Sequence, residues 1–261
     1  MKKRVLAVLL SMCLAFSGMM ISNAMTPSEA VSKGIDVSSH MGTINWSLVK
    51  PNIDFAIIRC GYGGDRTSQD DSQWANNVKG CEQNNIPFGV YLYSYAVSAA
   101  DAKSEAEHVI RLLKGHNPQL PVFYDIEDAT ISSSCSKKQI LENAKIFCTA
   151  LKNAGYQVGI YANKYWWTTY LTDSTYDQWE RWVAQYNSTC TYTGSFNYWQ
   201  YSQSGSIPGI SAKNVDMDYS KLSFTGGNHT NAASPFKDVP SNAWYAGYVN
   251  KAVDLGLMSG V

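Results

Sequence analysis

Two carboxylates lie two residues apart at the end of a short apolar run. Asp125 and Glu127 follow the run 122–124. In an extended strand alternate side chains point to the same face, so the two acids are expected to share one environment. Close carboxylates repel each other when both are ionised, so one of them should keep its proton near neutral pH. The pair therefore predicts a general acid, although the same pattern also occurs at solvated strand ends.

Two further acids end apolar runs in the same way, Asp36 near the N-terminus and Asp216 near the C-terminus. The first and last strands of a closed barrel are neighbours, so these acids should face the same cavity as Asp125 and Glu127. Such clustering destabilises a fold unless catalysis or binding uses it, and calcium coordination is the competing use. Arg59, at another strand end, is expected to form an ion pair with one of the acids.

Eight short runs could supply the strands that position these acids. Helical patterns separate the earlier runs, which is typical of parallel β/α folds. Eight such strands suggest a barrel, whose site lies at the carboxyl ends of the strands. The expected strands are Gly34–Ser38, Phe55–Tyr62, Phe88–Tyr95, Val122–Glu127, Val158–Ala162, Arg181–Tyr186, Tyr198–Tyr201 and Val215–Tyr219.

Clear helical patterns fall in the first half of the chain, over Ser72–Asn84, Ala99–Leu113 and Ser136–Ala154. The links between the later strands are shorter and more irregular. We therefore predict an α/β fold, an irregular TIM-like β/α barrel over residues 31–222 that is helical in its first half and strand-rich in its second. A short partial C-terminal helical module over residues 235–261 follows it.

The segments around the barrel have their own signatures. Residues 1–24 combine three basic residues with an apolar stretch and a small-residue end, which predicts a secretory signal peptide, with cleavage after Ala30 as the alternative. Residues 223–234 are small and polar and indicate a linker. No later run is long enough to span a bilayer. We expect a secreted bacterial protein, extracellular or associated with the cell wall, with no membrane partner after cleavage, that acts as a monomer.

Composition and charge exclude other classes. The chain is 45% hydrophobic, enough to bury one large core. Removal of residues 1–24 takes three of the 21 basic residues and none of the 21 acidic ones, so the mature chain is mildly acidic. A nucleic-acid partner normally requires a basic stripe, and no run of Lys and Arg outside the signal peptide supplies one. Nucleic-acid binding is therefore not expected.

The cysteines do not suggest a metal site. Beyond the signal peptide the chain keeps an odd number of them, without the paired spacing of a zinc site: Cys60, Cys81, Cys135, Cys148 and Cys190. Most fall on strand or helix patterns, where a buried free thiol is ordinary. We predict no metal and no cofactor, and assign no disulfide.

Four ordered motifs carry a family resemblance. They are residues 34–46, which begin Gly-Ile-Asp-Val-Ser-Ser-His-Met-Gly, residues 55–63, the central Asp125-Ile126-Glu127, and Trp199–Ser202 together with Val215-Asp216. In this order they resemble family 25 of the glycoside hydrolases, the Chalaropsis-type lysozymes, over about residues 33–222. The resemblance implies a muramidase that cleaves the β-1,4 bond between N-acetylmuramic acid and N-acetylglucosamine in peptidoglycan, with retention of configuration.

The resemblance also implies roles for the four acids. Glu127 matches the general acid, which would protonate the leaving glycosidic oxygen and later activate water. Asp125 and Asp216 match acids that stabilise developing positive charge or the acetamido group of the substrate, and Asp36 would orient the network. Whether a carboxylate or the acetamido group attacks stays open. The sequence departs from the family pattern at Leu92, where His is common, and at Asp218, where Asn is more usual.

Aromatic residues are more numerous than a core needs, with 17 Tyr and 8 Trp. Sugars pack their C–H faces on aromatic rings, so rings near strand ends could line a sugar cleft, although core packing explains each of them equally well. The candidates for substrate binding are Tyr62, Tyr93, Tyr161, Tyr186 and Trp199.

Residues 235–261 resemble the first half of an S-layer homology repeat, a family that binds secondary cell-wall polymers. Such a module would hold a hydrolase on its peptidoglycan substrate and raise its effective concentration. Two other functions compete with the muramidase: a non-catalytic cell-wall binding barrel, and a glycosidase acting on another amino-sugar polymer such as chitin. A binding-only barrel should have lost one of the acids, and a chitinase should carry a longer acidic strand motif.

Overall fold

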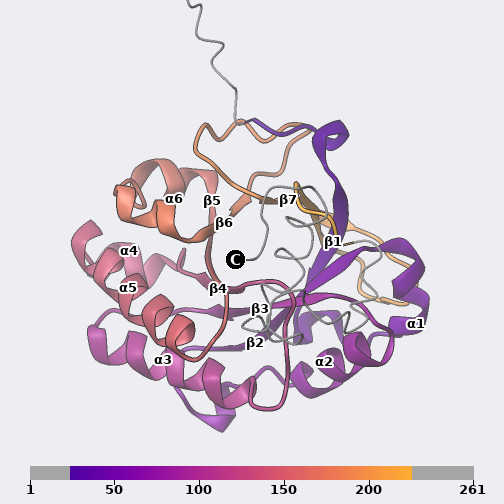
Figure 1. Ribbon diagram of the computed structural model, residues 1–261, viewed down its shortest axis with the longest axis horizontal. Coiled ribbons are helices and arrows are strands. Elements are labelled where there is room, and N and C mark those ends of the chain that lie inside the picture. The colour runs from indigo at the N-terminus through magenta and orange to yellow at the C-terminus, as the bar shows by residue number, and fades with distance from the viewer. Residues whose placement is uncertain (1–23, 225–261) are drawn as a thin grey trace, which may run out of the picture.

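The computed structural model describes residues 24–224, in which eight strands close into a barrel in chain order (Figure 1). The strands are β1 (Ser32–Val37), β2 (Phe55–Tyr62), β3 (Phe88–Tyr93), β4 (Val122–Asp125), β5 (Val158–Asn163), β6 (Glu180–Ala184), β7 (Tyr198–Gly205) and β8 (Val215–Ser220). Strands β1 to β7 run parallel, whereas β8 is antiparallel to both β7 and β1. The predicted irregular barrel is confirmed.

The helices lie outside the barrel, mainly around its first six strands (Figure 1). They are α1 (Trp46–Val49), α2 (Trp74–Gln83), α3 (Ala99–Leu112), α4 (Ala129–Ser134), α5 (Lys137–Asn153) and α6 (Lys164–Thr169). The three predicted helices correspond to α2, α3 and α5. Ser98 and Ser136 accept N–H hydrogen bonds at the starts of α3 and α5, which fixes where these helices begin.

Because successive side chains of a strand point to opposite faces, the apolar side chains of the barrel form two separate clusters. On β2, Ala56 and Ile58 join the outer cluster between barrel and helices, whereas Phe55 and Ile57 join the inner one. In the outer cluster, Tyr124 of β4 stacks on Phe147 of α5 with ring centroids 3.9 Å apart. Every second strand residue therefore points into the lumen, which decides which side chains can reach the site.

Aromatic rings fill the lumen, and small residues make room for them. A Cβ at Gly34 would lie 2.4 Å from the ring of Phe55, and one at Gly159 would lie 2.5 Å from Phe123. After β8 the chain packs Leu222 and Phe224 against this inner cluster. Because β8 ends beside the start of β1, these residues close the end of the barrel opposite the carboxyl ends of the parallel strands.

Four strands end earlier than expected, β1 by one residue and β3, β4 and β6 by two residues each. The predicted β3 reaches Tyr95, but the backbone N–H of Tyr95 donates to Glu105 of α3 instead of extending the sheet. The predicted β4 reaches Glu127, but the strand stops at Asp125, and Asp128 caps the N-terminus of α4. Glu127 thus lies on the loop just beyond the strand rather than on the strand itself.

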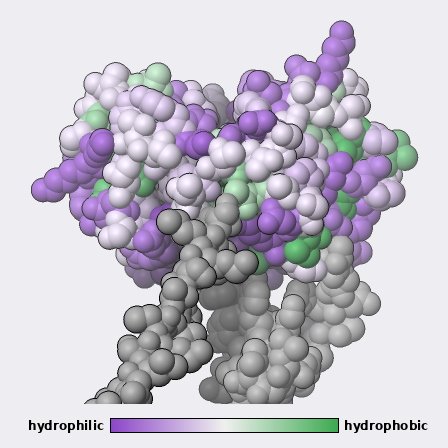
Figure 2. Space-filling view, turned by 90° about the horizontal axis from the view of Figure 1, so that it is seen from above, coloured by the Kyte–Doolittle hydropathy of each residue, from purple (hydrophilic) through white to green (hydrophobic). Residues whose placement is uncertain are grey.

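The predicted signal peptide, most of the linker and the C-terminal module lie outside the described residues. No helix within residues 24–224 is long and apolar enough to cross a membrane. The face seen in Figure 2 is mostly hydrophilic, with hydrophobic residues in small, separated patches.

Candidate active site

The strand register brings the predicted acids to one end of the lumen. Asp36 on β1 pairs in register with Asp216 on β8, and Asp125 ends β4 beside Tyr93 on β3. These acids share the inward alternation of the lumen residues, and they lie at the carboxyl ends of the parallel strands. The expected convergence of first and last strands is therefore confirmed for Asp36 and Asp216.

Asp125 and Glu127 form a coupled pair at this end. Burial, and then repulsion from Glu127, raises the pKa of Asp125 well above its ordinary value. No donor in the described part of the chain reaches its buried Oδ1 atom, which also favours the neutral acid. Burial raises the pKa of Glu127 as well, but the backbone N–H of Asn163 donates to its Oε2 at 2.5 Å and opposes this rise. Both shifts favour the protonated acid, which is the direction expected from the sequence.

The two acids differ in access. Asp125 is 4% exposed, whereas Glu127 is half-buried on the loop at the barrel mouth. Glu127 is therefore the member that can meet a substrate directly, and Asp125 lies beneath it. The loop after β4 that carries Glu127 is held by Asp128, which accepts hydrogen bonds from Thr130 and from the Tyr93 hydroxyl.

Asp216 also carries a raised pKa. Burial raises it to about 6, so this carboxyl group loses its proton just below neutral pH. Its pairing partner Asp36 is more deeply buried, and burial, followed by repulsion from Asp218 and Asp216, raises the pKa of Asp36 well above its ordinary value. Asp216 is therefore ionised near neutrality, whereas the deeper burial of Asp36 favours its protonated form more strongly.

Gln200 connects the acids to the rings, and the sequence interpretation missed it. Its Nε2 donates to Oδ2 of Asp36 at 2.7 Å, and its Oε1 accepts from the hydroxyls of Tyr161 and Tyr186, both at 2.9 Å. Gln200 belongs to the motif Trp199–Ser202 that carries part of the family resemblance. Its place in this motif is the sequence signal by which Gln200 could have been predicted as a site residue. The amide orients Asp36 from one side and fixes both tyrosines from the other.

Four of the five predicted rings lie near the mouth. Tyr186 is 50% exposed, Tyr62 and Tyr93 are half-buried, and Tyr161 is buried but bonded to the network. Tyr95, which was not predicted, is exposed and makes edge contacts with the rings of both Tyr62 and Tyr93. These three tyrosines form one wall of the mouth, and Tyr186 lies on the loop after β6.

Trp199 does not belong to the site, which corrects the prediction for this residue. It is fully buried in the outer cluster, its Nε1 donates to the Gln185 carbonyl at 2.8 Å, and its ring contacts Tyr201 and Tyr219. The reason is the strand period of two: Gln200 points into the lumen, so Trp199 points away from it.

Arg59 also differs from expectation. It forms an ion pair with Asp71 at 2.7 Å and donates to Ser39, rather than pairing with one of the four acids. Asp71 in turn accepts the backbone N–H of Ser39 at 2.9 Å. Arg59 therefore joins the loop after β1 to the loop after β2, and its charge acts on Asp125 only from a distance, where it lowers the pKa.

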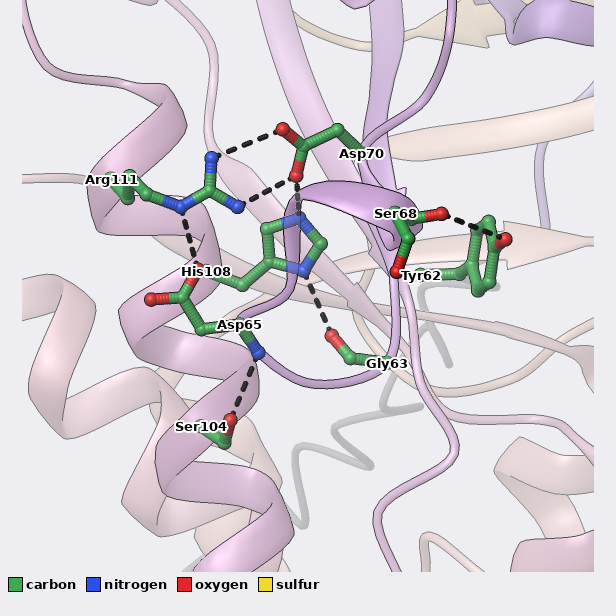
Figure 3. A network of polar contacts seen from close by, with 8 residues as sticks. All are labelled: Tyr62, Gly63, Asp65, Ser68, Asp70, Ser104, His108 and Arg111. Atoms are coloured by element: carbon green, nitrogen blue, oxygen red, sulfur yellow. Dashed lines mark hydrogen bonds and ion pairs between the residues drawn. The ribbon is translucent and has the colours of Figure 1, made fainter.

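The loop after β2, which follows Tyr62, is fastened to α3 by a buried histidine (Figure 3). The His108 ring nitrogens lie 2.9 Å from the Gly63 carbonyl and 2.8 Å from Oδ1 of Asp70. Arg111 donates to both oxygens of Asp70 and, through Nε, to Asp65. Both contacts of His108 fall on oxygen atoms of the loop, the Gly63 carbonyl and the Asp70 carboxylate, so the ring ties the loop to α3 at two points.

Replacing Asp70 with asparagine should lower the free energy of unfolding by about 1–3 kcal/mol at pH 7, because Arg111 and the buried His108 ring lose the carboxylate that they contact. Partial burial raises the pKa of Asp70, but hydrogen bonds from Arg111 and His108 outweigh it and hold the pKa below the ordinary 3.8. The stabilisation is thus present above about pH 4 and is lost as the pH falls through the folded-state pKa. Urea unfolding at pH 7 and pH 3 measures both effects.

Glu107→Gln is the matched control for Asp70→Asn, since the Lys103–Glu107 pair on the same helix is exposed. We expect it to change stability by less than about 0.5 kcal/mol. An equal loss in the two variants would contradict the role given to Asp70.

Residues 24–224 contain no cluster of metal-binding side chains, and their cysteines are free thiols. No group of three or more His, Cys, Asp or Glu side chains in this range could hold a metal ion. The five cysteines of the range are free thiols, four of them buried and Cys135 partly exposed. Burial raises the pKa of the Cys60 and Cys148 thiols, which keeps them protonated and unreactive.

Two regions of the chain match known families. Residues 35–210 match Glycosyl hydrolases family 25, and residues 235–261 match the S-layer homology domain. The Autolytic lysozyme of Clostridium acetobutylicum is 30% identical over 191 residues, which are 71% of this chain and 55% of that protein.

Solved structures give the same picture. The modular autolysin LytC from Streptococcus pneumoniae, in complex with a synthetic peptidoglycan ligand, is 29% identical with a TM-score of 0.64, and the match covers 72% of this chain and 46% of that one. A bacterial lysozyme from Streptomyces coelicolor, at 24% identity and a TM-score of 0.62, shares the fold over 73% of this chain and 92% of its own. The chain thus spans about half the length of the first two relatives.

The family match covers about two thirds of the chain and includes Asp36, Asp125 and Glu127. The closed eight-strand barrel agrees with it, with its acids at one end of the lumen. This chain belongs to family 25 of the glycosyl hydrolases.

Proposed function

We propose that this protein is a peptidoglycan hydrolase, an N-acetylmuramidase that cleaves the β-1,4 bond between N-acetylmuramic acid and N-acetylglucosamine with retention. The observation that carries the proposal is the coupled pair at the mouth of the barrel, a half-buried Glu127 above a buried Asp125, both with raised pKa values. The lysozyme names of the relatives support the choice of substrate.

In this mechanism Glu127 acts as the general acid. Its carboxyl proton passes to the glycosidic oxygen as the bond from that oxygen to the anomeric carbon breaks. A nucleophile, either a carboxylate or the acetamido oxygen of the substrate, bonds the opposite face of the anomeric carbon as the leaving group departs. The Glu127 carboxylate then takes a proton from the water that attacks this carbon and displaces the nucleophile, so that two inversions give retention. The backbone N–H of Asn163, which donates to Glu127, holds the carboxyl group in place through both steps.

Asp125 and Asp216 stabilise the positive charge that develops on the sugar or on its acetamido group. Asp36 orients the network through Gln200, whose Oε1 fixes Tyr161 and Tyr186. The tyrosines at the mouth offer ring faces to the sugars, with Tyr62, Tyr93 and Tyr95 on one side and Tyr186 on the other.

The direct test is to digest purified peptidoglycan with the full chain, reduce the products with borohydride, and identify the reducing-end sugar by mass spectrometry. New muramic acid ends are expected. Glucosamine ends, or binding without release, would contradict the muramidase and support another glycosidase or a binding barrel, respectively. Chitin, as a parallel substrate, should yield no soluble product.

Asp216→Asn should lower kcat by about 10²-fold, the size expected when one electrostatic stabiliser of the transition state is removed. The pKa of about 6 implies that wild-type activity rises as the pH increases through 6, where Asp216 becomes ionised. The variant should lose this rise, because its side chain cannot ionise. Initial rates from pH 4 to pH 8 measure this rise in activity. If the activity of the variant still rose through pH 6 as in the wild type, the rise would belong to another titrating group.

We further propose that residues 1–24 are a signal peptide, that residues 223–234 link the barrel to residues 235–261, and that this last region binds the secondary polymer of the cell wall. The described chain ends at Phe224, at the end of the barrel opposite the mouth. Binding to cell walls stripped of secondary polymer should be several-fold weaker than to intact walls. Equal binding to stripped and intact walls would contradict the proposal that residues 235–261 bind the secondary polymer.

A further inference from the structure

A second buried acid lies directly beneath the site. Asp218 on β8 pairs in register with Gly34 on β1. This is the next inward-facing pair after that of Asp36 and Asp216, and it lies farther from the mouth of the barrel. Asp218 is fully buried and Asp36 is 3% exposed. The mechanism proposed above gives Asp218 no task.

Three of the four oxygens of the two carboxyl groups have a defined environment. Oδ2 of Asp36 accepts from Gln200 at 2.7 Å, and Oδ1 of Asp218 accepts from the indole N–H of Trp182 at 2.8 Å. Oδ2 of Asp218 is buried, and no N–H or hydroxyl group of the described chain reaches it. Asp36 lies on the neighbouring strand, one inward position from Gly34, the register partner of Asp218, so its carboxyl group is the one placed to meet Oδ2 of Asp218.

A hydrogen bond between two carboxyl groups requires a proton, because an ionised carboxylate can only accept. We propose that Asp36 and Asp218 share one proton, so that the pair carries a single negative charge and Asp218 acts as a positioning residue that holds Asp36 under the catalytic acids. The role in catalysis rests on the proposed function, but the shared proton does not.

The surroundings favour one charge over two. The titratable groups that act on the pair are Asp216 on β8, Tyr91 on β3, Tyr161 on β5, Tyr186 after β6 and Tyr201 on β7. None of them supplies a positive charge, and Arg59 of β2 is held by Asp71. Two buried carboxylates without a cation would both be desolvated and would repel each other.

The titration of the pair agrees with this arrangement. Burial raises the pKa of Asp218 to about 8, although hydrogen bonds from Trp182 and Asp36 oppose the rise. In the unfolded chain an aspartate loses its proton near its ordinary value of 3.8. Between about pH 4 and pH 8 the folded protein therefore keeps a proton that the unfolded chain releases, and stability should fall as the pH rises across this window.

Asp218→Asn is the sharpest variant, because asparagine can reproduce both hydrogen bonds without the proton. Its Oδ1 can accept from Trp182, and its Nδ2 can donate to Asp36. The wild type should therefore lose one more proton on unfolding than the variant. From pH 5 to pH 8 its equilibrium constant for unfolding should rise with each pH unit by a factor about tenfold larger than the factor found for the variant, which is the effect of one linked proton. Asp173→Asn, an exposed helix cap whose pKa is lowered, is the control and should keep the wild-type slope in this range.

A spectroscopic measurement on the full chain tests the proton directly. With aspartate labelled by ¹³C at the carboxyl carbon, the wild type at pH 6.5 should show one more protonated side chain than Asp218→Asn. If the proposed function holds, the ratio of kcat/KM at pH 9 to that at pH 7 should also be higher in the variant, since it has no shared proton to lose.

Equal unfolding slopes, or equal numbers of protonated aspartates in the two proteins, would overturn the shared proton. These two readouts need no substrate. If neither protein hydrolyses peptidoglycan, the proposed function fails while the unfolding and carboxyl measurements still decide the state of the pair. If hydrolysis occurs and the ratios at pH 9 and pH 7 are equal, the positioning role is wrong.

Discussion

Glu127→Gln is expected to lower kcat for peptidoglycan hydrolysis by about 10²–10⁴-fold, the contribution typical of a positioned general acid and base. Glutamine keeps the size of the side chain, and its carbonyl can still accept the Asn163 N–H that now reaches Oε2 at 2.5 Å. What it lacks is the proton for the leaving oxygen. KM should change little, because the ground-state contacts remain. Release of reducing ends from purified peptidoglycan measures both constants.

Asp128→Asn is the matched control, the same acid-to-amide change one residue along the loop. Asp128 caps α4 through Oδ1 and accepts the Tyr93 hydroxyl at Oδ2; asparagine keeps the cap through its amide oxygen, and its amide N–H can donate to the Tyr93 hydroxyl oxygen instead. We expect less than a tenfold loss of kcat. If the two variants lost activity equally, the loop rather than the acid at Glu127 would be responsible, and the assignment of the general acid would be wrong.

The role of Glu127 as general acid also determines how activity changes at alkaline pH. Burial raises the pKa of Glu127, and the acid form must be present for the first step, so activity should fall as the pH rises through that pKa. Asp216 must be ionised and gains activity as the pH rises through about 6. The two requirements together predict a bell-shaped profile for kcat/KM.

Much of the fold could be predicted from residue patterns, because a parallel barrel repeats one local signal. Runs such as Phe55–Tyr62 are bounded by turn residues, and the expected range coincides with β2. The helices α3 and α5 begin at serine caps that are visible in the sequence. Short helices such as α4 and α6 carry too few turns to show a period, so they could not be predicted in the same way.

The site was harder to predict, because it depends on which face of each strand points inward. An error of one residue reverses the face, and this is how Trp199 was assigned to the cleft while its neighbour Gln200 was overlooked. Tyr95 was missed because β3 was expected to continue through it. The four acids were found because each lies within or directly after a short strand-like run, a signal that does not depend on knowing the interior face.

Trp182→Ala should lower the free energy of unfolding by about 3–5 kcal/mol, the largest stability effect we expect from a single lumen residue. The ring is 1% exposed and contacts Tyr91, Phe123 and Tyr161, so truncation leaves a cavity at the centre of the barrel. It also removes the donor to Oδ1 of Asp218. Urea unfolding followed by circular dichroism gives the change.

Phenylalanine substitutions separate packing from hydrogen bonding, because the chain offers a second buried indole for comparison. Trp46 is 4% exposed, and its Nε1 has no partner among the described residues, whereas Nε1 of Trp182 bonds Asp218. Both changes to Phe lose ring area, but only Trp182→Phe strips a donor from a buried carboxyl group. We expect it to cost about 1–3 kcal/mol more than Trp46→Phe. Equal costs would mean that the indole bond adds nothing to stability and that Asp218 relies on Asp36 alone.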